Sequence, residues 1–489
     1  MQNDKTKITQ QETDFSKWYL DVIECAELAE NSPVRGSMVI KPYGYAIWEN
    51  IQKFLDLEFK KIGIQNAYFP LLIPKSFLEK EAQHVEGFAK ECAVVTHHRL
   101  EEVDGKLIPA GELEEPLIIR PTSETIIYDT FSRWIKSYRD LPLLINQWAN
   151  VMRWEMRTRL FLRSSEFLWQ EGHTAHELAL EAENMALNAL NLYKRFLEEE
   201  LAISAVPGKK TENEKFAGAD YTLTLEALMQ DGKALQCCTS HMLGQNFSKS
   251  FNVSFLDKNQ TQQYVWQTSW GLSTRIIGAL IMSHSDNKGL VLPPRIAPIQ
   301  VVLIPIYDNK DDAVKILDKI KNIAEDLALN NIRYKIDDRE GRPGFKFFEW
   351  ERRGVPLRIE LGPKDLMKQT VVLVDRLEGN KVFISDTNIT EVVTDELQKI
   401  QLKLLEKTSS YRLANTHEVD NYDELKTVLQ SKPGFVSVYL CKDLNCEKSI
   451  KEETGATTRC IPFSETGGDG ECIFCKNKTS IKLLLAKAY

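Results

Sequence analysis

The sequence has no apolar run long enough to cross a bilayer, and its first residues are polar, unlike the apolar core of a secretory signal. It has no internal repeat and no low-complexity segment. It also lacks an excess of positive charge. The formal net charge is −8, which argues against a protein that coats nucleic acid nonspecifically. We therefore expect a cytoplasmic protein that has no membrane partner.

What is present is the composition of a soluble globular protein, with 43% hydrophobic and 27% charged residues. A chain of 489 residues is long enough for about two to four domains with cores of their own. In a cytoplasmic protein the nine cysteines should be mostly reduced thiols. Their distribution is uneven, and five lie near the C-terminus, at Cys441, Cys446, Cys460, Cys472 and Cys475.

The pattern of the chain changes at a segment rich in proline, glycine and polar residues, from Asp286 to Pro298, which we interpret as a linker. After it, apolar strands alternate with helices, and this predicts a parallel-type sheet covered on both faces. A further unit with a helix, a strand and the cysteine cluster begins near Leu405. We expect three domains, with the boundaries 1–290, 299–404 and 405–489.

Before the linker the sequence predicts a mixture of helices and strands, as in an α+β domain. Residues 16–32 and 175–200 are expected to be helical. A β-rich run over 67–73 contains Pro70, which suits an edge or interface strand. The pair Asp104-Gly105 predicts the turn of a β-hairpin.

A second predicted hairpin has a charged mouth. An alternating strand over 144–156 carries Arg153 and Glu155 on one face, and a short basic loop turns the chain back into 167–173. Arginines at such a mouth can hold phosphates through forked hydrogen bonds, and an aromatic ring such as Phe167 can stack on a base. The alternative is a charged hairpin end that binds no ligand.

This hairpin resembles motif 2 of the class II aminoacyl-tRNA synthetases, whose catalytic domain is built on an antiparallel sheet. The helix before Gly63 and the run with Pro70 resemble motif 1, which implies a homodimer. The strand 262–268, the following glycine turn and the next helix resemble motif 3. The resemblance implies a site for ATP and magnesium, with Arg153 at the α-phosphate, Glu155 at the adenine edge or the metal, Arg163 and Arg275 at the γ-phosphate, and Phe167 on the adenine face.

Four further segments resemble the prolyl-tRNA synthetase family, and the match covers essentially the whole chain: Arg120-Pro-Thr-Ser-Glu-Thr125, Trp169-Gln-Glu-Gly-His-Thr174, Phe216-Ala-Gly-Ala-Asp220 and Cys238-Thr-Ser-His241. Proline needs a carboxylate for its secondary ammonium and an apolar wall for its ring. The resemblance assigns the ammonium to Glu124, Thr122 and Glu171, the ring to Trp169, His173, Phe216 and His241, both substrates to Arg153, and the nucleotide surroundings to Gln236, Thr239 and Ser273. Taken singly, these residues also suit core aromatics, structural histidines and a helix N-cap.

The activity implied is the ATP-dependent attachment of L-proline to tRNA(Pro) through a prolyl-adenylate. The chain between Arg163 and Arg275 leaves no room for an inserted editing domain, so it resembles the shorter archaeal- and eukaryote-like branch. We do not expect Cys237 or Cys238 to act as a nucleophile. One alternative is a noncatalytic paralogue that binds tRNA, which would have damaged ATP residues. Another is a synthetase for a substrate such as threonine, which would be expected to carry zinc ligands in its catalytic domain.

Residues 299–404 resemble the anticodon-binding domain of this class of synthetases. The basic run from Arg333 to Arg358 is the expected RNA surface, where acidic and backbone acceptors read guanines while cations hold phosphates. Within it the resemblance points to Arg342, Lys346, Glu349 and Arg353. The alternative is a solvated charged helix.

Two cysteine pairs at the C-terminus have the spacing of metal ligands. Four thiolates suit a structural zinc ion, and the pattern resembles the small α/β zinc-binding C-terminal domain of this branch, with Cys441, Cys446, Cys472 and Cys475 as ligands. The alternative is a set of ordinary cysteines, and we expect Cys460 to lie in the core. The resemblance also implies that the terminal Tyr489 is ordered and folds back towards the active site.

Overall fold

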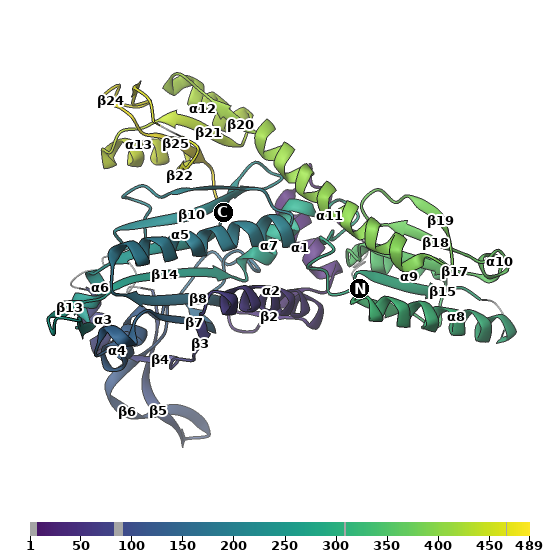
Figure 1. Cartoon of the computed structure of the whole chain (residues 1–489), viewed down its shortest axis with the longest axis horizontal. Helices are drawn as coiled ribbons and strands as arrows, with labels where there is room; N and C mark the ends of the chain where they lie inside the picture. Colours follow the sequence, from purple (N-terminus) through teal and green to yellow (C-terminus); the bar gives the residue numbers. More distant parts are fainter. Residues whose placement is uncertain (1–6, 83–90, 308–309, 466) are drawn as a thin grey trace.

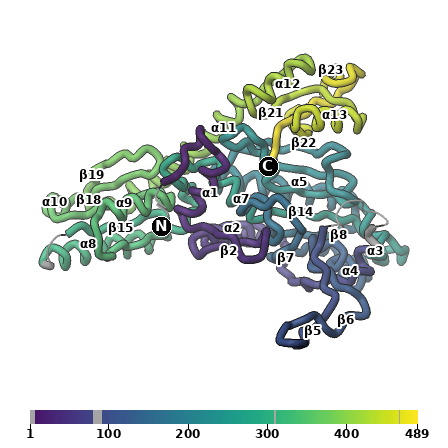
Figure 2. The backbone as a smooth tube through the Cα atoms, turned by 180° about the vertical axis from the view of Figure 1, so that it is seen from behind, coloured from purple at the N-terminus to yellow at the C-terminus, as the bar shows by residue number. Residues whose placement is uncertain are grey.

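The computed structural model describes residues 7–82, 91–307, 310–465 and 467–489. Figure 1 shows a large central sheet, a smaller α/β unit beside it, and a C-terminal unit that adjoins the central sheet. Figure 2, seen from behind, shows the end of the chain returning to the central sheet. This arrangement agrees with the expected fold class.

The first unit contains most of the central sheet and the helices around it. Its helical elements are α1 (Phe15–Cys25), α2 (Pro42–Lys61), α3 (Lys75–Ala82), α4 (Glu124–Trp134), the 3-10 turn η1 (Tyr138–Asp140), α5 (Ala179–Arg195), the π-helical turn η2 (Phe196–Glu200), α6 (Asn246–Ser250) and α7 (Arg275–His284). Its strands are β1 (Ala29–Asn31), β2 (Met38–Ile40), β3 (Gln65–Asn66), β4 (Leu72–Pro74), β5 (Ala93–Val103), β6 (Lys106–Ile119), β7 (Leu143–Met152), β8 (Glu166–His176), β9 (Ala205–Lys209), β10 (Tyr221–Leu228), β11 (Ala234–Gly244), β12 (Ser254–Leu256), β13 (Gln262–Tyr264) and β14 (Trp266–Ser273).

The second unit is a five-stranded sheet with helices on both faces. Its elements are β15 (Val301–Pro305), α8 (Lys310–Leu329), β16 (Tyr334–Ile336), α9 (Pro343–Arg352), β17 (Leu357–Leu361), α10 (Pro363–Met367), β18 (Thr370–Asp375), β19 (Lys381–Ser385) and α11 (Ile389–Ala414). The strand order is β16-β15-β17-β18-β19. Helices α8 and α11 share one core with this sheet, whereas Trp350 of α9 packs with Val302 and Ile304 in another.

The expectation of a parallel-type sheet in this unit is only partly right. Strand β15 is parallel to β16 and β17, but β18 and β19 are antiparallel to their neighbours. The chain between β17 and β18 contains only the short helix α10, and β18 connects to β19 through a tight turn. Because a parallel crossover needs about a dozen residues or more, these connections require antiparallel pairing.

The C-terminal unit consists of β20 (Thr416–Glu418), α12 (Tyr422–Ser431), β21 (Phe435–Tyr439), α13 (Leu444–Thr454), β22 (Thr457–Pro462), β23 (Gly470–Glu471), β24 (Lys478–Thr479) and β25 (Lys482–Ala486). Four strands of this unit extend the central sheet, while β23 and β24 pair with each other in a separate two-stranded sheet. The eleven-stranded order is β20-β21-β25-β22-β9-β10-β11-β14-β8-β7-β3. At the junction Ile461 pairs with Lys209, and a Cβ on Gly208 would lie 2.5 Å from the Ile461 carbonyl oxygen. A glycine is therefore required at position 208 for β22 to reach the sheet.

Helix α11 runs without a break through the expected boundary between residues 404 and 405 (Figure 1). Its second half is fixed to the first unit, because Thr408 donates to the Ala202 carbonyl and Tyr411 donates to the Gln230 carbonyl, both at 2.8 Å. The helix thus connects all three units.

Some expected elements are shorter than their apolar patterns suggest. Helix α1 ends at Cys25 because Glu27 adopts φ +53°, a left-handed conformation that turns the chain into β1. The expected strand over 67–73 is broken: β4 begins only at Leu72, after Pro70, which has no N–H to donate. The predicted helix over 175–200 starts at Ala179, because β8 continues to His176.

The hairpin predicted around Asp104-Gly105 is confirmed as β5 and β6. Both turn residues have positive φ, 52° and 72°. The hairpin projects from the body of the protein (Figures 1 and 2). No helix in the described part of the chain is long and apolar enough to span a membrane.

Candidate active site and C-terminal thiol cluster

The main cavity lies on the face of the central sheet opposite the core that buries Trp270. Residues that pair directly across an antiparallel sheet point to the same face. One such row across β10, β11, β14 and β8 consists of Thr222, His241, Ser269 and His173. The next row consists of Thr224, Thr239, Gly271 and Glu171. Apart from Thr224, which is not in the lining, the residues of these two rows form the floor of the cavity.

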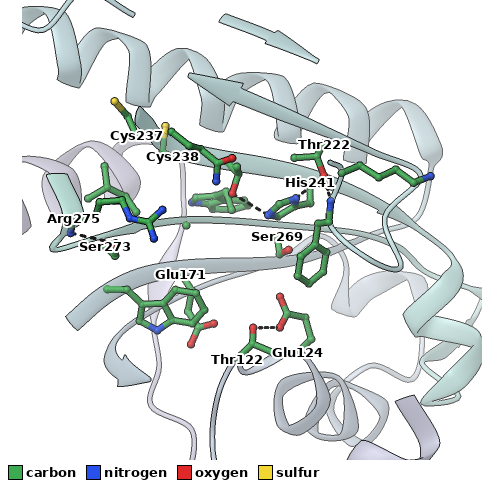
Figure 3. A pocket seen from close by; sticks show the side chains of 18 of the residues that line it. Thr122, Glu124, Glu171, Thr222, Cys237, Cys238, His241, Ser269, Ser273 and Arg275 are labelled. Atoms are coloured by element: carbon green, nitrogen blue, oxygen red, sulfur yellow. Dashed lines mark hydrogen bonds between the residues drawn. The ribbon is translucent and has the colours of Figure 1, made fainter. Parts of the chain in front are cut away.

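The cavity has a volume of about 420 Å³, and Figure 3 shows the side chains that line it. Gly271 has no side chain, so the middle of the second row stays open. Gly172, in the adjacent strand β8, faces the opposite side of the sheet. A Cβ at this position would lie 2.0 Å from the Trp270 ring. The lining includes these residues singled out from the sequence: Thr122, Glu124, Arg153, Phe167, Trp169, Glu171, His173, Phe216, Gln236, Thr239, His241, Ser273 and Arg275.

One wall of the cavity is the start of α4, where Thr122 donates to the Glu124 carboxylate. The Glu124 side chain is buried and points into the cavity (Figure 3). Glu171 differs, because one of its oxygens accepts from Ser123 and Gln147 and the other is 3.0 Å from His173 Nε2. Glu171 therefore holds the wall and the floor together and has partners on both oxygens.

The two histidines of the first row have opposite electrostatic surroundings. Burial alone would lower the pKa of His173, but the Glu171 hydrogen bond and the Glu171 and Glu124 charges raise it above its ordinary value. Burial, together with the nearby His173, lowers the pKa of His241 to about 3. His241 is therefore neutral at physiological pH. Its ring lies 4.6 Å from that of Phe216, and together the two rings form an aromatic wall.

The opposite end of the cavity is cationic. Arg153 donates from Nε to the Pro121 carbonyl at 2.9 Å, and its guanidinium lies 5.6 Å from the Phe167 ring and 5.8 Å from the Trp169 ring. Burial, reinforced by the nearby Arg275, lowers the pKa of Arg153 to about 10, although Glu124 opposes this. The guanidinium is still charged at neutral pH, so it can bind an anion in an enclosed space.

A second cavity of about 300 Å³ adjoins the first and shares Arg153, Phe167, Ser273 and Arg275 with it. It also contains Glu155, Arg163 and Tyr489, so the expected nucleotide residues divide between two connected spaces. Strand β7 ends at Met152, and Arg153 and Glu155 therefore lie in the turn after the strand. This turn is held by the Arg153 amide, which donates to the Ser165 carbonyl at 2.7 Å.

The expected ordering of Tyr489 is confirmed. Its amide donates to the Ala234 carbonyl at 3.1 Å, and its hydroxyl donates to Asp231 at 2.6 Å. The ring also lies 5.5 Å from the Arg159 guanidinium. The last residue of the chain is thus a wall of the second cavity.

The thiols of Cys237 and Cys238 are buried, and burial raises the pKa of both well above the ordinary cysteine value. Because a thiolate is the reactive form, neither has the environment of a nucleophile, as expected from the sequence.

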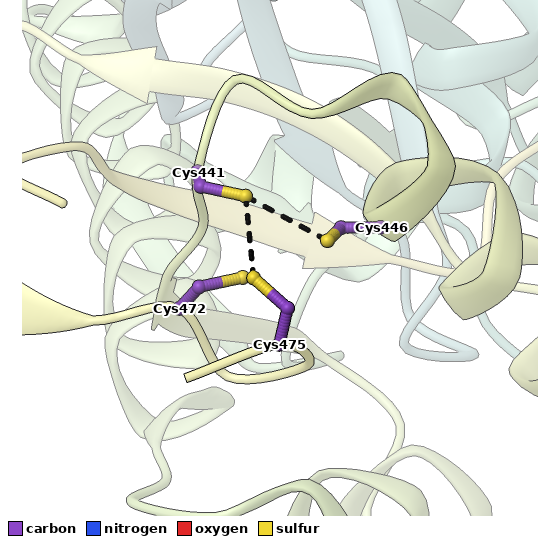
Figure 4. Close-up of side chains that lie close together, drawn as sticks. All are labelled: Cys441, Cys446, Cys472 and Cys475. Carbon is purple, nitrogen blue, oxygen red and sulfur yellow. Dashed lines mark hydrogen bonds between the residues drawn. The ribbon is translucent and has the colours of Figure 1, made fainter. Parts of the chain in front are cut away.

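The four C-terminal cysteines predicted as metal ligands form one cluster (Figure 4), and their sulfur atoms all lie within 4.8 Å of one another. The Cys441 sulfur is 3.6 Å from that of Cys446 and 3.7 Å from that of Cys475. Burial would raise the pKa of Cys472, but backbone N–H groups of the cluster lower it to about 7. Cys460 is fully buried in β22, outside the cluster, as expected.

The four residues expected to contact the anticodon do not form one free cationic face. Arg342 is exposed at the start of α9. The Lys346 ammonium is buried and donates to the Asp337 carbonyl at 3.1 Å. Arg353 pairs with Glu27 of the first unit, and Glu349 accepts from Arg339 at 2.8 Å. Two of the expected cations therefore already have partners within the protein.

Several residues of the site were given no role by the sequence analysis. Ser123 and Gln147 bind Glu171, Thr222 binds His241, and Ser269 and Gly271 lie in the middle of the floor. Only the register between distant strands brings them together, and that register is not encoded in local periodicity.

Comparison with known proteins gives matches to three family descriptions along the chain. Residues 107–284 match the tRNA synthetase class II core domain (G, H, P, S and T). Residues 300–396 match the anticodon binding domain, and residues 422–489 match the C-terminal region of prolyl-tRNA synthetase.

Similar proteins match this chain over its whole length. Proline--tRNA ligase of Amoebophilus asiaticus (strain 5a2) is 52% identical, with 99% of each chain covered. That of Flavobacterium johnsoniae is 53% identical over 99% of each chain, and that of Parabacteroides distasonis is 52% identical over 100% of each.

Proposed function

This chain belongs to the proline--tRNA ligase family of class II aminoacyl-tRNA synthetases, and we propose that its main cavity carries out both steps of proline attachment to tRNA(Pro). In the first step a proline carboxylate oxygen attacks the α-phosphorus of ATP, and pyrophosphate leaves. In the second step the terminal ribose hydroxyl of the tRNA attacks the activated carbonyl, and AMP leaves. The noncatalytic alternative is not favoured, because relatives named as ligases match the whole chain.

The observation that carries this proposal is one cavity with two chemically distinct ends. A buried carboxylate, Glu124, and an aromatic wall lie at one end, and the guanidinium groups of Arg153 and Arg275 lie at the other. A zwitterionic amino acid and a polyanionic nucleotide need this separation of charge. Positioning and charge neutralisation supply most of the catalysis, and no covalent intermediate with the enzyme is required.

We assign the nucleotide to the cationic end. Arg153 binds the α-phosphate and the proline carboxylate, Arg163 and Arg275 bind the γ-phosphate, and Phe167 stacks on adenine. Gln236, Thr239 and Ser273 surround the nucleotide. Glu155, whose carboxylate lines the second cavity, would hold magnesium, which neutralises phosphate charge when bound.

We assign proline to the other end of the cavity. Glu124 binds the secondary ammonium with help from Thr122, while Trp169, Phe216, His173 and His241 enclose the ring. Glu171 supports this set through its bonds to Ser123 and His173. A hydrogen bond to a charged group contributes about 1.5–3 kcal/mol, so the Glu124 contact is expected to dominate selection of the ammonium.

We further propose that Cys441, Cys446, Cys472 and Cys475 hold a structural zinc ion. A tetrahedral site with Zn–S bonds of about 2.3 Å separates its sulfur atoms by about 3.8 Å, which is close to the distances of the Cys441 sulfur from those of Cys446 and Cys475, 3.6 and 3.7 Å. Elemental analysis should give one zinc per chain. It should give none for Cys446→Ser and an unchanged content for Cys460→Ser.

The remaining proposals concern tRNA, assembly and location. The domain boundaries are 1–290, 299–404 and 405–489, with the anticodon read by the second domain through Arg342, Lys346, Glu349 and Arg353. Contact by Lys346 or Arg353 would require these side chains to exchange their present partners. We also propose a homodimer, a cytoplasmic location and membership of the archaeal- and eukaryote-like branch. Light scattering and cell fractionation test the first two.

Charging of a tRNA(Pro) transcript with labelled proline tests the function as a whole. We expect proline-dependent, ATP-dependent charging that falls when either anticodon guanine shared by proline tRNAs is replaced. Binding of the same transcript without any charging would favour the noncatalytic alternative.

A further inference from the structure

We propose that Glu447 of the C-terminal unit is a positioning residue for the amino-acid end of the main cavity. It binds Thr211, the first residue of the loop 211–219, and this loop carries Phe216 of the aromatic wall. The inference rests on the proposed function, because it takes this end of the cavity to bind proline. Neither the motifs in the sequence nor the family matches assign a role to Glu447 or Thr211.

The loop 211–219 connects β9 to β10, and it contributes to the lining of the cavity through Glu214, Lys215, Phe216 and Ala217. Both ends of the loop are fixed to the central sheet. Before the loop, the Lys210 amide donates to the Thr222 carbonyl at 2.8 Å. After it, the Asp220 amide donates to the Met242 carbonyl at 2.8 Å. The position of the aromatic wall therefore depends on how the chain between these two anchors is held.

The start of the loop is held from the C-terminal unit. The Thr211 hydroxyl donates to the Glu447 carboxylate in α13 at 3.1 Å and lies 3.2 Å from the Thr458 hydroxyl in β22. The Thr211 carbonyl accepts from the amides three and four residues later, at 3.2 and 2.9 Å. These two bonds form a turn that leads directly into Phe216. Thr211 thus joins the C-terminal unit to the turn that precedes the aromatic wall.

The burial of Glu447 is unfavourable for folding alone. Its side chain is buried, and within the described part of the chain its carboxylate binds only the hydroxyls of Thr211 and Thr458, with no cation beside it. A buried carboxylate without a counter-charge costs stability. The position of Glu447 in the first turn of α13, where the amide dipoles favour negative charge, offsets part of this cost. Its bonds to the two hydroxyls are charge-assisted and therefore stronger than bonds between neutral groups.

The other two carboxylates of α13 behave differently. Glu452 is exposed and pairs with Lys448 of the same helix at 3.9 Å. Glu453 is also exposed and accepts from Tyr422, within the C-terminal unit, at 3.0 Å. Glu447 alone among the three binds a residue of the first unit. Its neighbours on the helix therefore provide matched controls.

The contact should affect proline binding in a specific way. Without it, the start of the loop is free to move, and proline must order the aromatic wall as it binds. A contact between Phe216 and the proline ring is the same in the ground state and the transition state. Its loss therefore raises the KM for proline and leaves kcat unchanged. The arginines of the cationic end belong to other elements, so the KM for ATP should not change.

The test uses Thr211→Val in the full-length protein, because valine removes the hydroxyl at nearly constant size and leaves the C-terminal unit intact. In ATP–pyrophosphate exchange we expect a KM for proline that is about 3- to 10-fold higher, the loss of one hydrogen bond, with kcat and the KM for ATP unchanged. Thr211→Ser keeps the hydroxyl and should be close to the wild type. Glu447→Ala should resemble Thr211→Val, whereas Glu452→Ala should leave the KM for proline unchanged.

A double variant distinguishes this one contact from a general loosening of the fold. If both residues act through the same hydrogen bond, Thr211→Val combined with Glu447→Ala should be no worse than the poorer single variant. Effects of the two changes that multiply would overturn the inference. So would an unchanged KM for proline in Thr211→Val, or an equal rise in the KM for ATP.

Hydrogen exchange of the loop amides gives a readout that does not depend on the reaction. We expect residues 214–216 to exchange faster in Thr211→Val than in the wild type and Thr211→Ser. Equal rates in all three proteins would overturn the inference. A wild type without proline-dependent pyrophosphate exchange would instead refute the proposed function. The hydrogen-exchange comparison would still decide whether Glu447 holds the loop, so the two failures are distinguishable.

Discussion

Arg459 in β22 donates two hydrogen bonds to one carboxylate oxygen of Glu226 in β10, at 2.9 and 2.7 Å. Lys210, next to β9, donates to the other oxygen at 2.8 Å. All three side chains are buried. This ion cluster therefore ties the C-terminal unit to the strands that form the cavity floor.

Replacing Glu226 by Gln should strongly destabilise the junction between the C-terminal unit and the central sheet. The change leaves two buried cations without a counter-charge, and breaking a buried pair in this way costs about 3–5 kcal/mol. Urea unfolding measures the loss. The matched control is Glu418→Gln, which breaks the exposed pair with Lys482 and should cost about 0–1 kcal/mol. Equal effects of the two changes would contradict a stabilising role for the cluster.

The contribution of this cluster should depend on pH. Burial alone would raise the pKa of Glu226, but the Lys210 and Arg459 charges hold it below its ordinary value of 4.5. A carboxyl whose pKa is depressed by folding stabilises the protein above the ordinary value, and this stabilisation is lost as pH falls through the folded-state value. The stability difference between the wild type and Glu226→Gln should therefore be constant near neutral pH and shrink below pH 4.5. A difference that grows on acidification would contradict this.

Thr222→Val should weaken ATP binding although Thr222 is absent from the expected nucleotide set. The Phe216 amide donates to the Thr222 oxygen at 2.9 Å, and this oxygen lies 2.9 Å from Nδ1 of His241. Nε2 of the same ring lies 3.0 Å from the Thr239 oxygen, so the His241 ring links Thr222 to a residue of the expected nucleotide set. We expect a KM for ATP that is about 3- to 10-fold higher in Thr222→Val and nearly normal in Thr222→Ser. Equal effects of valine and serine would contradict this arrangement.

Deleting Tyr489 should raise the KM for ATP, because the ring is a wall of the cavity that also contains Arg163 and Arg275. Loss of one aromatic contact corresponds to about a 2- to 10-fold change. Tyr489→Phe keeps the ring and loses only the bond to Asp231, so its effect should be smaller. Pyrophosphate exchange at varied ATP measures both variants. Normal kinetics after deletion would show that the terminal residue has no role at the site.

The sequence predicted those parts of the fold whose signal is local. The Asp104-Gly105 turn and the spacing of the four clustered cysteines are examples, because turn chemistry and ligand pairs are encoded within a few residues. Glu27 carries no comparable signal, and its left-handed conformation ends α1 earlier than expected.

Features that depend on pairing between distant strands were not predictable in this way. Nothing near Ile461 indicates that β22 would pair with β9, some 250 residues earlier, and extend the central sheet. The same holds for Ser269, a single serine in an alternating strand, whose position between two histidines follows from register alone. Similarly, the interior partners of Lys346 and Arg353 were not visible in a basic run that suggested an open RNA surface.

ATP–pyrophosphate exchange with each amino acid in turn, without tRNA, tests the central claim most directly. The comparison is between the wild type, Arg153→Ala at the cationic end of the cavity, and Arg157→Ala, a nearby exposed arginine that lies outside both cavities. The account predicts exchange that is strongest with proline, abolished in Arg153→Ala and retained in Arg157→Ala. No exchange with any amino acid by folded wild-type protein in the presence of magnesium would contradict it.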